Sequence, residues 1–191
     1  MFPLASPKVI QRAQQILAYQ PLFIDTETTG LTENDVVIEI GVVDLAGNTL
    51  FESLVKPSIP IPPDSMAVHG ISEAMVASAP SWKDIWPNLQ SVLQGHFVGM
   101  YNLDFDLRMM KQTHARYWLD WPMDDKRFFC VMKLYAAFYG QPSRQGRGYR
   151  FHKLEAAGAV CGIPLSNAHR AVDDALLTAA LFKYIAEYSA E

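Results

Sequence analysis

The stretch LFIDTETTG at residues 22–30 constrains this chain more than any other. An apolar strand, residues 22–24, runs into Asp25 and Glu27 and then into a turn rich in threonine. Side chains alternate along a strand, so the two carboxylates point to the same side. They repel each other unless a cation lies between them, and Mg²⁺ or Mn²⁺ is the ion that such oxygen ligands favour. On these residues alone, a metal site and a polar turn that closes a hairpin are equally good interpretations.

The size and composition indicate one ordinary globular domain. Its 191 residues suffice for a full hydrophobic core, and 50% of them are hydrophobic. No apolar run approaches the roughly 20 residues that a membrane helix needs, and the N-terminal residues lack the charged-then-apolar order of a signal peptide. Cys130 and Cys161 are too few for a disulfide framework. We therefore expect a cytoplasmic location and no membrane partner.

Hydrophobic periodicity predicts an α/β fold with a central mixed β-sheet flanked by helices. A helix is expected over residues 7–17, with its apolar face docked on the following sheet. Strands are expected at 22–25, 36–44, 49–55 and 96–101, and helices just after 72, at 81–94, after 106, and at 130–138, 151–161 and 170–188. The connecting segments are a stiff proline-rich stretch at 57–63, an irregular one at 115–127 and a flexible basic loop at 140–150.

Charge is distributed unevenly along the chain. The net charge of −4 argues weakly against a nucleic-acid partner, yet residues 108–153 are strongly basic, as expected of a surface that binds phosphates. Solvated helix faces explain part of this cluster, so charge alone does not establish nucleic-acid binding. The cations are Arg108, Lys111, Arg116, Lys126, Arg127, Lys133, Arg144, Arg147, Arg150 and Lys153, and the opposing acids are Asp120, Asp124 and Asp125.

Two further acidic positions stand at the starts of predicted helices. Asp106 follows the strand at 96–101, and Asp174 lies near the start of the last helix, five residues after His169. Taken singly, Asp106 is more often a helix N-cap, Asp174 a solvated first-turn acid and His169 a structural residue. In combination with Asp25 and Glu27, the set is far more specific.

These residues lie in motifs that resemble those of the DEDDh (DnaQ-like) 3′→5′ exonuclease superfamily, which has the RNase H-like fold. DTETTG at 25–30 is similar to the first family motif, NLDFD at 102–106 to the second, and HRAVDDA at 169–175 to the third. The turn VHGIS at 68–72 also resembles a family feature. The family includes the proofreading subunit of bacterial DNA polymerase III. The resemblance implies one exonuclease domain over 1–191, with 1–20 a helical extension and 21–188 the catalytic core.

The family pattern decides between neighbouring acids. It places the ligand of the second motif at Asp106 rather than Asp104, and that of the third at Asp174 rather than Asp173. Two departures stand out: Tyr101 occupies a position where many members carry His, and FCVMK at 129–133 replaces the Asp-Thr-Leu often seen in that region. No catalytic role is carried over to the latter segment.

The resemblance implies a two-metal phosphodiesterase. Asp25, Glu27, Asp106 and Asp174 would hold two Mg²⁺ or Mn²⁺ ions on the scissile phosphate, and His169 would be the general base on the attacking water. Nucleoside 5′-monophosphates would leave the 3′ end of single-stranded or frayed DNA, in proofreading or repair. Two divalent cations balance four carboxylates, so an acidic chain can still bind an acidic polymer.

Substrate contacts follow from the resemblance as well. Thr28, Gly30 and Leu31 would line the pocket of the terminal nucleotide, with Leu31 wedged against a base. His69 would approach from the other wall, and Asn102 of the second motif is also assigned to substrate binding.

The basic loop supplies the last candidates, Arg147 and Arg150. Together with Arg144 and Tyr149 they are a candidate track for the incoming strand, since basic and aromatic side chains bind single strands without sequence preference. A surface loop without a ligand is an equally good interpretation. The tryptophans are interpreted as core residues rather than stacking platforms; they are Trp82, Trp86, Trp118 and Trp121.

Several alternatives remain open. A 3′→5′ exoribonuclease of the RNase T or oligoribonuclease type would share the active-site residues. A non-catalytic nucleic-acid-binding module would lack a ligand or the base. A subunit bound to a polymerase would expose an apolar stripe on the first helix, at Val9, Ile10, Ile16 and Leu17. A polymerase or a second copy of the chain is thus the candidate protein partner.

Overall fold

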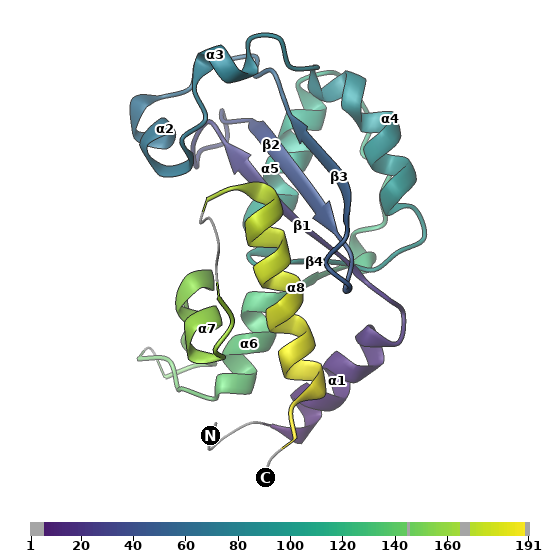
Figure 1. Cartoon of the computed structure of the whole chain (residues 1–191), viewed down its shortest axis with the longest axis vertical. Coiled ribbons are helices and arrows are strands. Elements are labelled where there is room, and N and C mark those ends of the chain that lie inside the picture. The colour runs from purple at the N-terminus through teal and green to yellow at the C-terminus, as the bar shows by residue number, and fades with distance from the viewer. Residues whose placement is uncertain (1–5, 145, 165–168, 190–191) are drawn as a thin grey trace.

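A five-stranded mixed β-sheet forms the centre of the protein (Figure 1). The computed structural model describes residues 6–144, 146–164 and 169–189. The strands are β1 (Leu22–Thr28), β2 (Val37–Val43), β3 (Thr49–Leu54), β4 (Val98–Met100) and β5 (Phe128–Cys130). Their order is β3-β2-β1-β4-β5, with β1, β2 and β3 antiparallel and β4 and β5 parallel to β1. The mixed sheet predicted from the sequence is confirmed.

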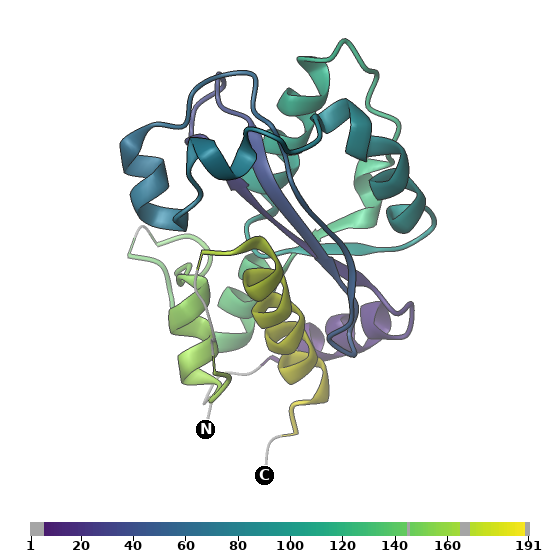
Figure 2. The same ribbon diagram turned by 45° about the horizontal axis from the view of Figure 1, so that its top comes forward.

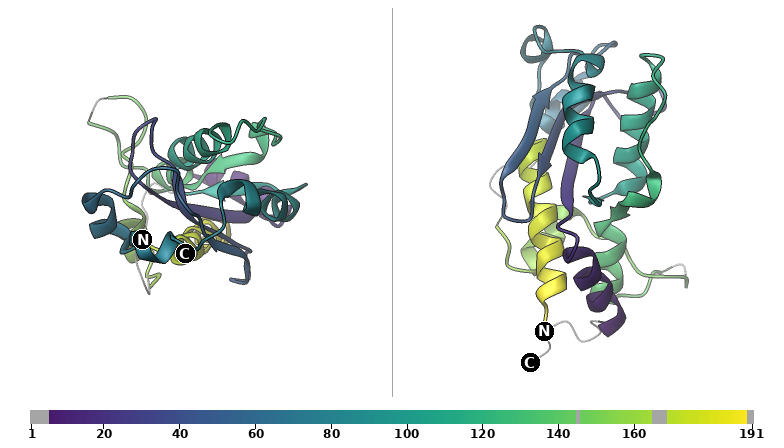
Figure 3. Two further views of the ribbon diagram at one scale, coloured as in Figure 1. Left: turned by 90° about the horizontal axis from the view of Figure 1, so that it is seen from above. Right: turned by 90° about the vertical axis from the view of Figure 1, so that its right-hand side faces the viewer.

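Helices cover both faces of this sheet. One face carries α1 (Pro7–Leu17), α6 (Val131–Tyr139), α7 (Leu154–Val160) and α8 (Ala171–Glu187), and the other carries α4 (Trp82–Leu93) and α5 (Leu103–Ala115). The right-hand view of Figure 3 shows α8 and α5 on opposite sides of β1. The short helices α2 (Pro63–His69) and α3 (Glu73–Val76) lie at one end of the sheet, which Figure 2 brings forward.

The two cores follow from the alternation of side chains along the strands. Phe23 packs against Phe182 of α8, with 5.4 Å between ring centroids, whereas Ile24 belongs to the cluster under α4 and α5. Every residue of β2 is buried, as its run of β-branched residues predicts for a strand covered on both sides. Glu39, the one charged residue of β2, is therefore enclosed.

The N-terminal helix packs mainly on other helices. α1 contacts α8 and α6. Its residues Ala13 and Ile16 are buried, and Val9, Ile10 and Leu17 are partly buried against the same cluster. The expected docking on the sheet is wrong because α8 already covers that face of β1. The exposed apolar stripe expected of a polymerase-docking helix is not found on α1.

Three further expectations need correction. The stiff connector at 57–63 ends in a helix, α2, because Pro63 occupies a first-turn position where a missing N–H costs nothing. β5 directly follows the segment expected to be irregular, where no strand was expected, and is a short edge strand. Trp118 is 96% exposed just after the end of α5, with a left-handed φ of 56°, whereas Trp82 and Trp86 are core residues as predicted. None of the described helices has the length and apolar character needed to span a membrane.

The contact between α8 and β2 depends on Gly41. A Cβ at this position would lie 2.7 Å from the backbone nitrogen of Val172 and 2.8 Å from the carbonyl carbon of Ala171. Both are backbone atoms of the first turn of α8, which have no rotamer to change. The start of this helix therefore lies directly against β2.

Gly41→Ala is expected to destabilise the protein by about 1–3 kcal/mol, since the added methyl must push α8 away from the sheet. Chemical denaturation measures the change. Ser91→Ala, on the exposed face of α4, is the control and should change stability by less than about 0.5 kcal/mol. Wild-type stability in Gly41→Ala would contradict this close contact.

Candidate active site

Asp25 and Glu27 project from β1 toward α8. Both share a face with Phe23, as the predicted alternation requires. In the antiparallel ladder Asp25 lies opposite Gly41 and Glu27 lies opposite Glu39. Because Gly41 admits the first turn of α8, that turn approaches the two carboxylates closely.

Asp106 reaches the same region from the first turn of α5. Its side chain is 4% exposed, and its Oδ1 accepts a hydrogen bond of 2.9 Å from Thr26 Oγ1. The N-cap of α5 is Asn102, so Asp106 is not the cap. The bond from Thr26, which lies between Asp25 and Glu27, ties the start of α5 to β1.

Asp174 and His169 come from the start of α8. Asp174 is 8% exposed and is therefore not a solvated first-turn acid. Its Oδ2 accepts the N–H of His169 at 3.3 Å, and His169 adopts a φ of 63°, which residues with a side chain rarely do. One ligand atom each from Glu27, His169 and Asp174 lie within 4.8 Å of one another. His169 Nε2 also lies 3.9 Å from Glu155 Oε1 of α7.

Burial raises the pKa of all four carboxyl groups, and repulsion from neighbouring acids adds to the shift. For Asp25, burial and then the charges of Asp106, Asp174, Glu27 and Glu39 hold the pKa well above its ordinary range. Burial is also the largest cause at the other three, and it raises the pKa of Glu27 to about 8, of Asp106 to about 7 and of Asp174 to about 6. Each shift disfavours the ionised form, so the cluster lacks compensating positive charge.

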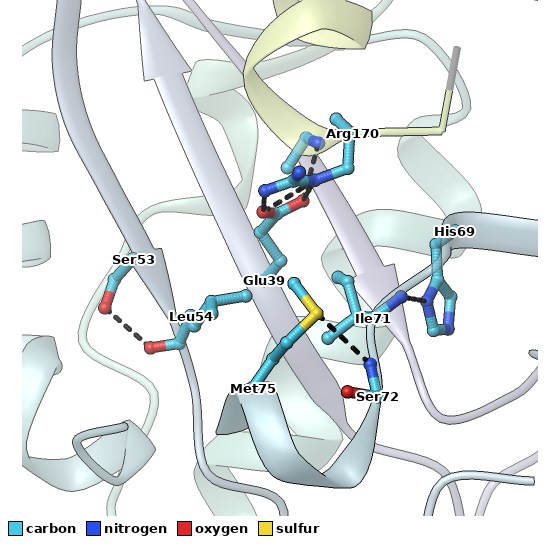
Figure 4. Close-up of polar contacts among 9 residues, drawn as sticks. Glu39, Ser53, Leu54, His69, Ile71, Ser72, Met75 and Arg170 are labelled. Atoms are coloured by element: carbon cyan, nitrogen blue, oxygen red, sulfur yellow. Dashed lines mark hydrogen bonds and ion pairs between the residues drawn. The ribbon is translucent and has the colours of Figure 1, made fainter. Parts of the chain in front are cut away.

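A nearby cation, Arg170, is already bound to a fifth carboxylate. Its Nε donates to the two oxygens of Glu39 at 3.0 and 3.2 Å (Figure 4). Asp174 Oδ1 is buried and has no hydrogen-bond partner among the described residues. Such an oxygen, in a cluster of mutually repelling carboxylates, is what a hard divalent cation binds. The donor set therefore fits Mg²⁺ or Mn²⁺.

The turn after β1 is built around the carboxylate of Asp35. It accepts a hydrogen bond from Thr29 Oγ1 at 2.9 Å, and a Cβ on Gly30 would lie 2.7 Å from it. Thr28 donates its hydroxyl to Gly30 O at 2.7 Å and so uses it within the turn. Leu31 projects from this hydrogen-bonded turn with 76% of its surface exposed.

His69 and Asn102 offer polar groups at the same end of the sheet. His69 ends α2, and its Nδ1 accepts the N–H of Ile71 at 3.0 Å (Figure 4). The ring proton is thereby assigned to Nε2, a buried atom without a hydrogen-bond partner among the described residues. Burial lowers the pKa of His69, so it is a neutral donor. The side chain of Asn102 makes no capping bond to α5.

The basic loop after α6 borders a hollow of about 620 Å³. Hydrogen bonds from Ser143 N to Gly148 O (3.1 Å) and from Arg150 N to Gln141 O (2.9 Å) close the loop like a hairpin. Tyr101, just after β4, donates its hydroxyl to His152 O at 2.7 Å and anchors the end of the loop. The charged and aromatic side chains that line the hollow are Lys133, Arg144, Arg147, Tyr149, Arg150 and Phe151.

The sequence analysis did not identify Glu39, Thr26 or Asp35. Glu39 is the one charged residue in the apolar run at 36–43, and a charge inside a buried strand is a signal for a specific partner. Thr26 and Asp35 carry no comparable signal, since threonine in a strand and aspartate in a turn are common.

The fold and the carboxylate cluster define the class: an RNase H-like domain with the donor set of a metal-dependent nuclease. The RNase T family model, described as an exonuclease, matches residues 22–182. The chain therefore belongs to this exonuclease family.

Individual relatives support this assignment. An uncharacterized exonuclease, CP81, of Escherichia phage 186 is 39% identical over 184 residues, which cover 94% of each chain. A DNA polymerase III subunit epsilon-like protein of Rhodobacter capsulatus is 30% identical over 83% of this chain, but the chain spans only 22% of that protein. A solved structure of exonuclease X with 5′ overhanging duplex DNA is 29% identical, with a TM-score of 0.65 over 86% of this chain and 89% of that one.

The raised carboxyl pKa values predict how stability depends on pH without metal. In EDTA, the melting temperature should fall as the pH rises from about 4 to about 8. The folded state holds protons on Glu27, Asp106 and Asp174 that the unfolded chain releases near pH 4, so stability is lost as those protons leave. Mg²⁺ at pH 8 should restore part of the loss. Thermal unfolding across this range, with EDTA or Mg²⁺, measures both effects.

Asp25→Asn removes one of the mutually repelling carboxyl groups from the cluster and should raise the melting temperature in EDTA at pH 8. Glu33→Gln, in the exposed turn, serves as the control and should leave it unchanged. A lower melting temperature in Asp25→Asn would contradict uncompensated repulsion.

Proposed function

We propose that this protein is a Mg²⁺- or Mn²⁺-dependent 3′→5′ exonuclease that releases nucleoside 5′-monophosphates from single-stranded or frayed DNA. The observation that carries the proposal is the convergence of four mutually repelling carboxylates beside His169, with the nearby Arg170 committed to Glu39. Asp25, Glu27, Asp106 and Asp174 would hold two ions. When bound, the ions polarise the scissile phosphate and stabilise the charge that develops on it.

The residues of this chain would then divide the remaining work. His169, partly exposed and beside Asp174 and Glu27, would take the proton of the attacking water. The water oxygen bonds to phosphorus as the bond to the 3′ oxygen of the preceding nucleotide breaks. The released product is a nucleoside 5′-monophosphate, and the departing 3′ oxygen takes a proton from solvent to become the 3′ hydroxyl of the shortened strand.

Substrate binding is assigned to groups that the fold leaves uncommitted. Leu31, which projects from the turn after β1, would wedge against the terminal base. Gly30 would line the same pocket through its backbone, since the space of its missing Cβ is taken by the carboxylate of Asp35. His69 would donate its Nε2–H to the sugar–phosphate. Asn102 would bind the substrate through its side-chain amide. Thr28 would bind it through backbone groups, since its hydroxyl already donates to Gly30 O.

DNA is favoured over RNA because the structure of exonuclease X, similar over most of this chain, contains duplex DNA with a 5′ overhang. An exoribonuclease remains the second candidate, since the nuclease domain of 3′hExo, of the same fold at 17% identity, was solved with rAMP.

Both cysteines are free thiols, which supports the proposed cytoplasmic location. The proposed catalytic core is residues 21–188, and α1 packs against it as an extension. A polymerase or a second copy of the chain remains a candidate partner, through a surface other than α1.

The direct test uses 5′-labelled DNA and RNA strands of equal sequence, with Mg²⁺, Mn²⁺ or EDTA. A ladder that shortens from the 3′ end, absent in EDTA, is expected. His169→Ala should lower kcat by about 10²–10⁴-fold, and Asp25→Ala by at least as much. Asp125→Asn, which removes an exposed acid, is the control. Full activity in EDTA or in Asp25→Ala would overturn the metal assignment. Faster cleavage of DNA would identify a deoxyribonuclease, and faster cleavage of RNA would identify a ribonuclease.

The basic loop is proposed to track the strand upstream of the cleaved nucleotide. Arg147→Ala/Arg150→Ala should raise KM for a long oligonucleotide about tenfold and leave a dinucleotide nearly unaffected. The salt dependence should also weaken, by about 1.4 in the log–log slope for two lost contacts to single-stranded phosphates. Steady-state kinetics over a range of salt concentrations measures both quantities.

The matched control is Lys8→Ala/Arg12→Ala, which removes two exposed cations from α1. Equal losses on the long and short substrates, or equal effects in the control, would exclude the strand track.

A further inference from the structure

Glu39 and Arg170 form an ion pair beside the proposed active site that none of the proposed catalytic steps uses. Glu39 is 2% exposed and Arg170 34%. The carboxylate is fully engaged: Oε1 accepts from Nε and Nη2 of Arg170, and Oε2 accepts from the same Nε and from Ala171 N at 2.9 Å. Figure 4 shows this fork at the start of α8. A carboxylate with so many donors has a single low-energy orientation.

The same face of β2 also limits where α8 can lie. Glu39 and Gly41 are two residues apart and therefore point to one side of the strand. Glu39 binds a free N–H at the start of the helix, and Gly41 lies against the backbone of Val172. The hydrogen bond from the Ala171 N–H to Glu39 and the steric contact at Gly41 together fix the position of the first turn of α8.

Arg170 lies between two of the proposed functional residues. His169 precedes it in a left-handed conformation, and its N–H binds Asp174 Oδ2. The N–H of Asp174 in turn donates to Arg170 O at 3.0 Å. A displacement of Arg170 would therefore move both His169 and Asp174.

The pair also controls a fifth carboxylate. Glu39 lies directly opposite Glu27 in the β1–β2 ladder, on the same face of the sheet. Without Arg170, Glu39 Oε1 would lose both of its donors next to the four proposed ligands, and Oε2 would keep only the N–H of Ala171.

We propose that Glu39 and Arg170 are a positioning pair that sets the base and one ligand of the active site and keeps Glu39 out of the metal-binding set. The inference rests on the proposed function and deepens it. Neither residue touches the reacting atoms; both act through His169 and Asp174.

Two kinds of variant test the pair by kinetics below the melting temperature. Arg170→Lys keeps the charge but loses the two-pronged geometry, so kcat should fall about 10–100-fold with KM within about threefold. Arg170→Ala leaves Glu39 buried and unpaired, so the double variant Glu39→Gln/Arg170→Ala should be more active and more stable than Arg170→Ala alone. Asp125→Asn breaks the exposed Lys111–Asp125 pair as a control and should stay within about twofold of wild type.

Calorimetric titration with Mn²⁺ gives a readout that does not depend on turnover. Mispositioning of Asp174 should weaken Mn²⁺ binding in Arg170→Lys about tenfold, the usual scale for residues that orient ligands. Wild-type kcat and Mn²⁺ affinity in Arg170→Lys, or no recovery in the double variant, would overturn the positioning role. Failure of wild type to cleave DNA or RNA would instead sink the proposed function, and Mn²⁺ affinity would still decide the positioning claim.

Discussion

Repulsion between buried carboxylates is the constraint on which this structure depends. Asp25, Glu27, Asp106 and Asp174 are brought together from β1, α5 and α8, and burial raises the pKa of each. Such an arrangement costs stability unless cations enter, so the surrounding fold must hold the elements in place by other contacts. Thr26 ties α5 to β1 through Asp106, and the apolar cores on both sides of the sheet fix the rest.

Helix α8 connects packing to chemistry. Its buried face fills the core against β1 and β2, and its first turn carries the residues that complete the cluster. Gly41 allows that turn to approach the sheet, and Glu39 accepts the N–H of Ala171 at its start. A helix placed in this way brings Asp174 and His169 to the carboxylates of β1. The same packing explains why α1 lies on α8 and α6 instead of on the sheet.

Much of the site could be predicted from the sequence because its signals are local. Alternation along one strand puts Asp25 and Glu27 on one side, and ordered family motifs select Asp106 and Asp174. The Glu39–Arg170 pair could not be predicted in the same way, since its members are 131 residues apart and pairing depends on how α8 crosses β2. The exposure of the tryptophan at 118 and the start of α2 likewise depend on chain reversals that composition does not specify.

The most direct measurement is anomalous diffraction from crystals soaked with Mn²⁺ and a nucleoside 5′-monophosphate. The account predicts two manganese peaks, both within bonding distance of the carboxylates of Asp25, Glu27, Asp106 and Asp174, with the nucleotide phosphate between the ions and His169. Manganese bound elsewhere, or a cluster that stays protonated and empty at pH 8 with saturating Mn²⁺, would contradict the claim that these four acids are held together to bind metal.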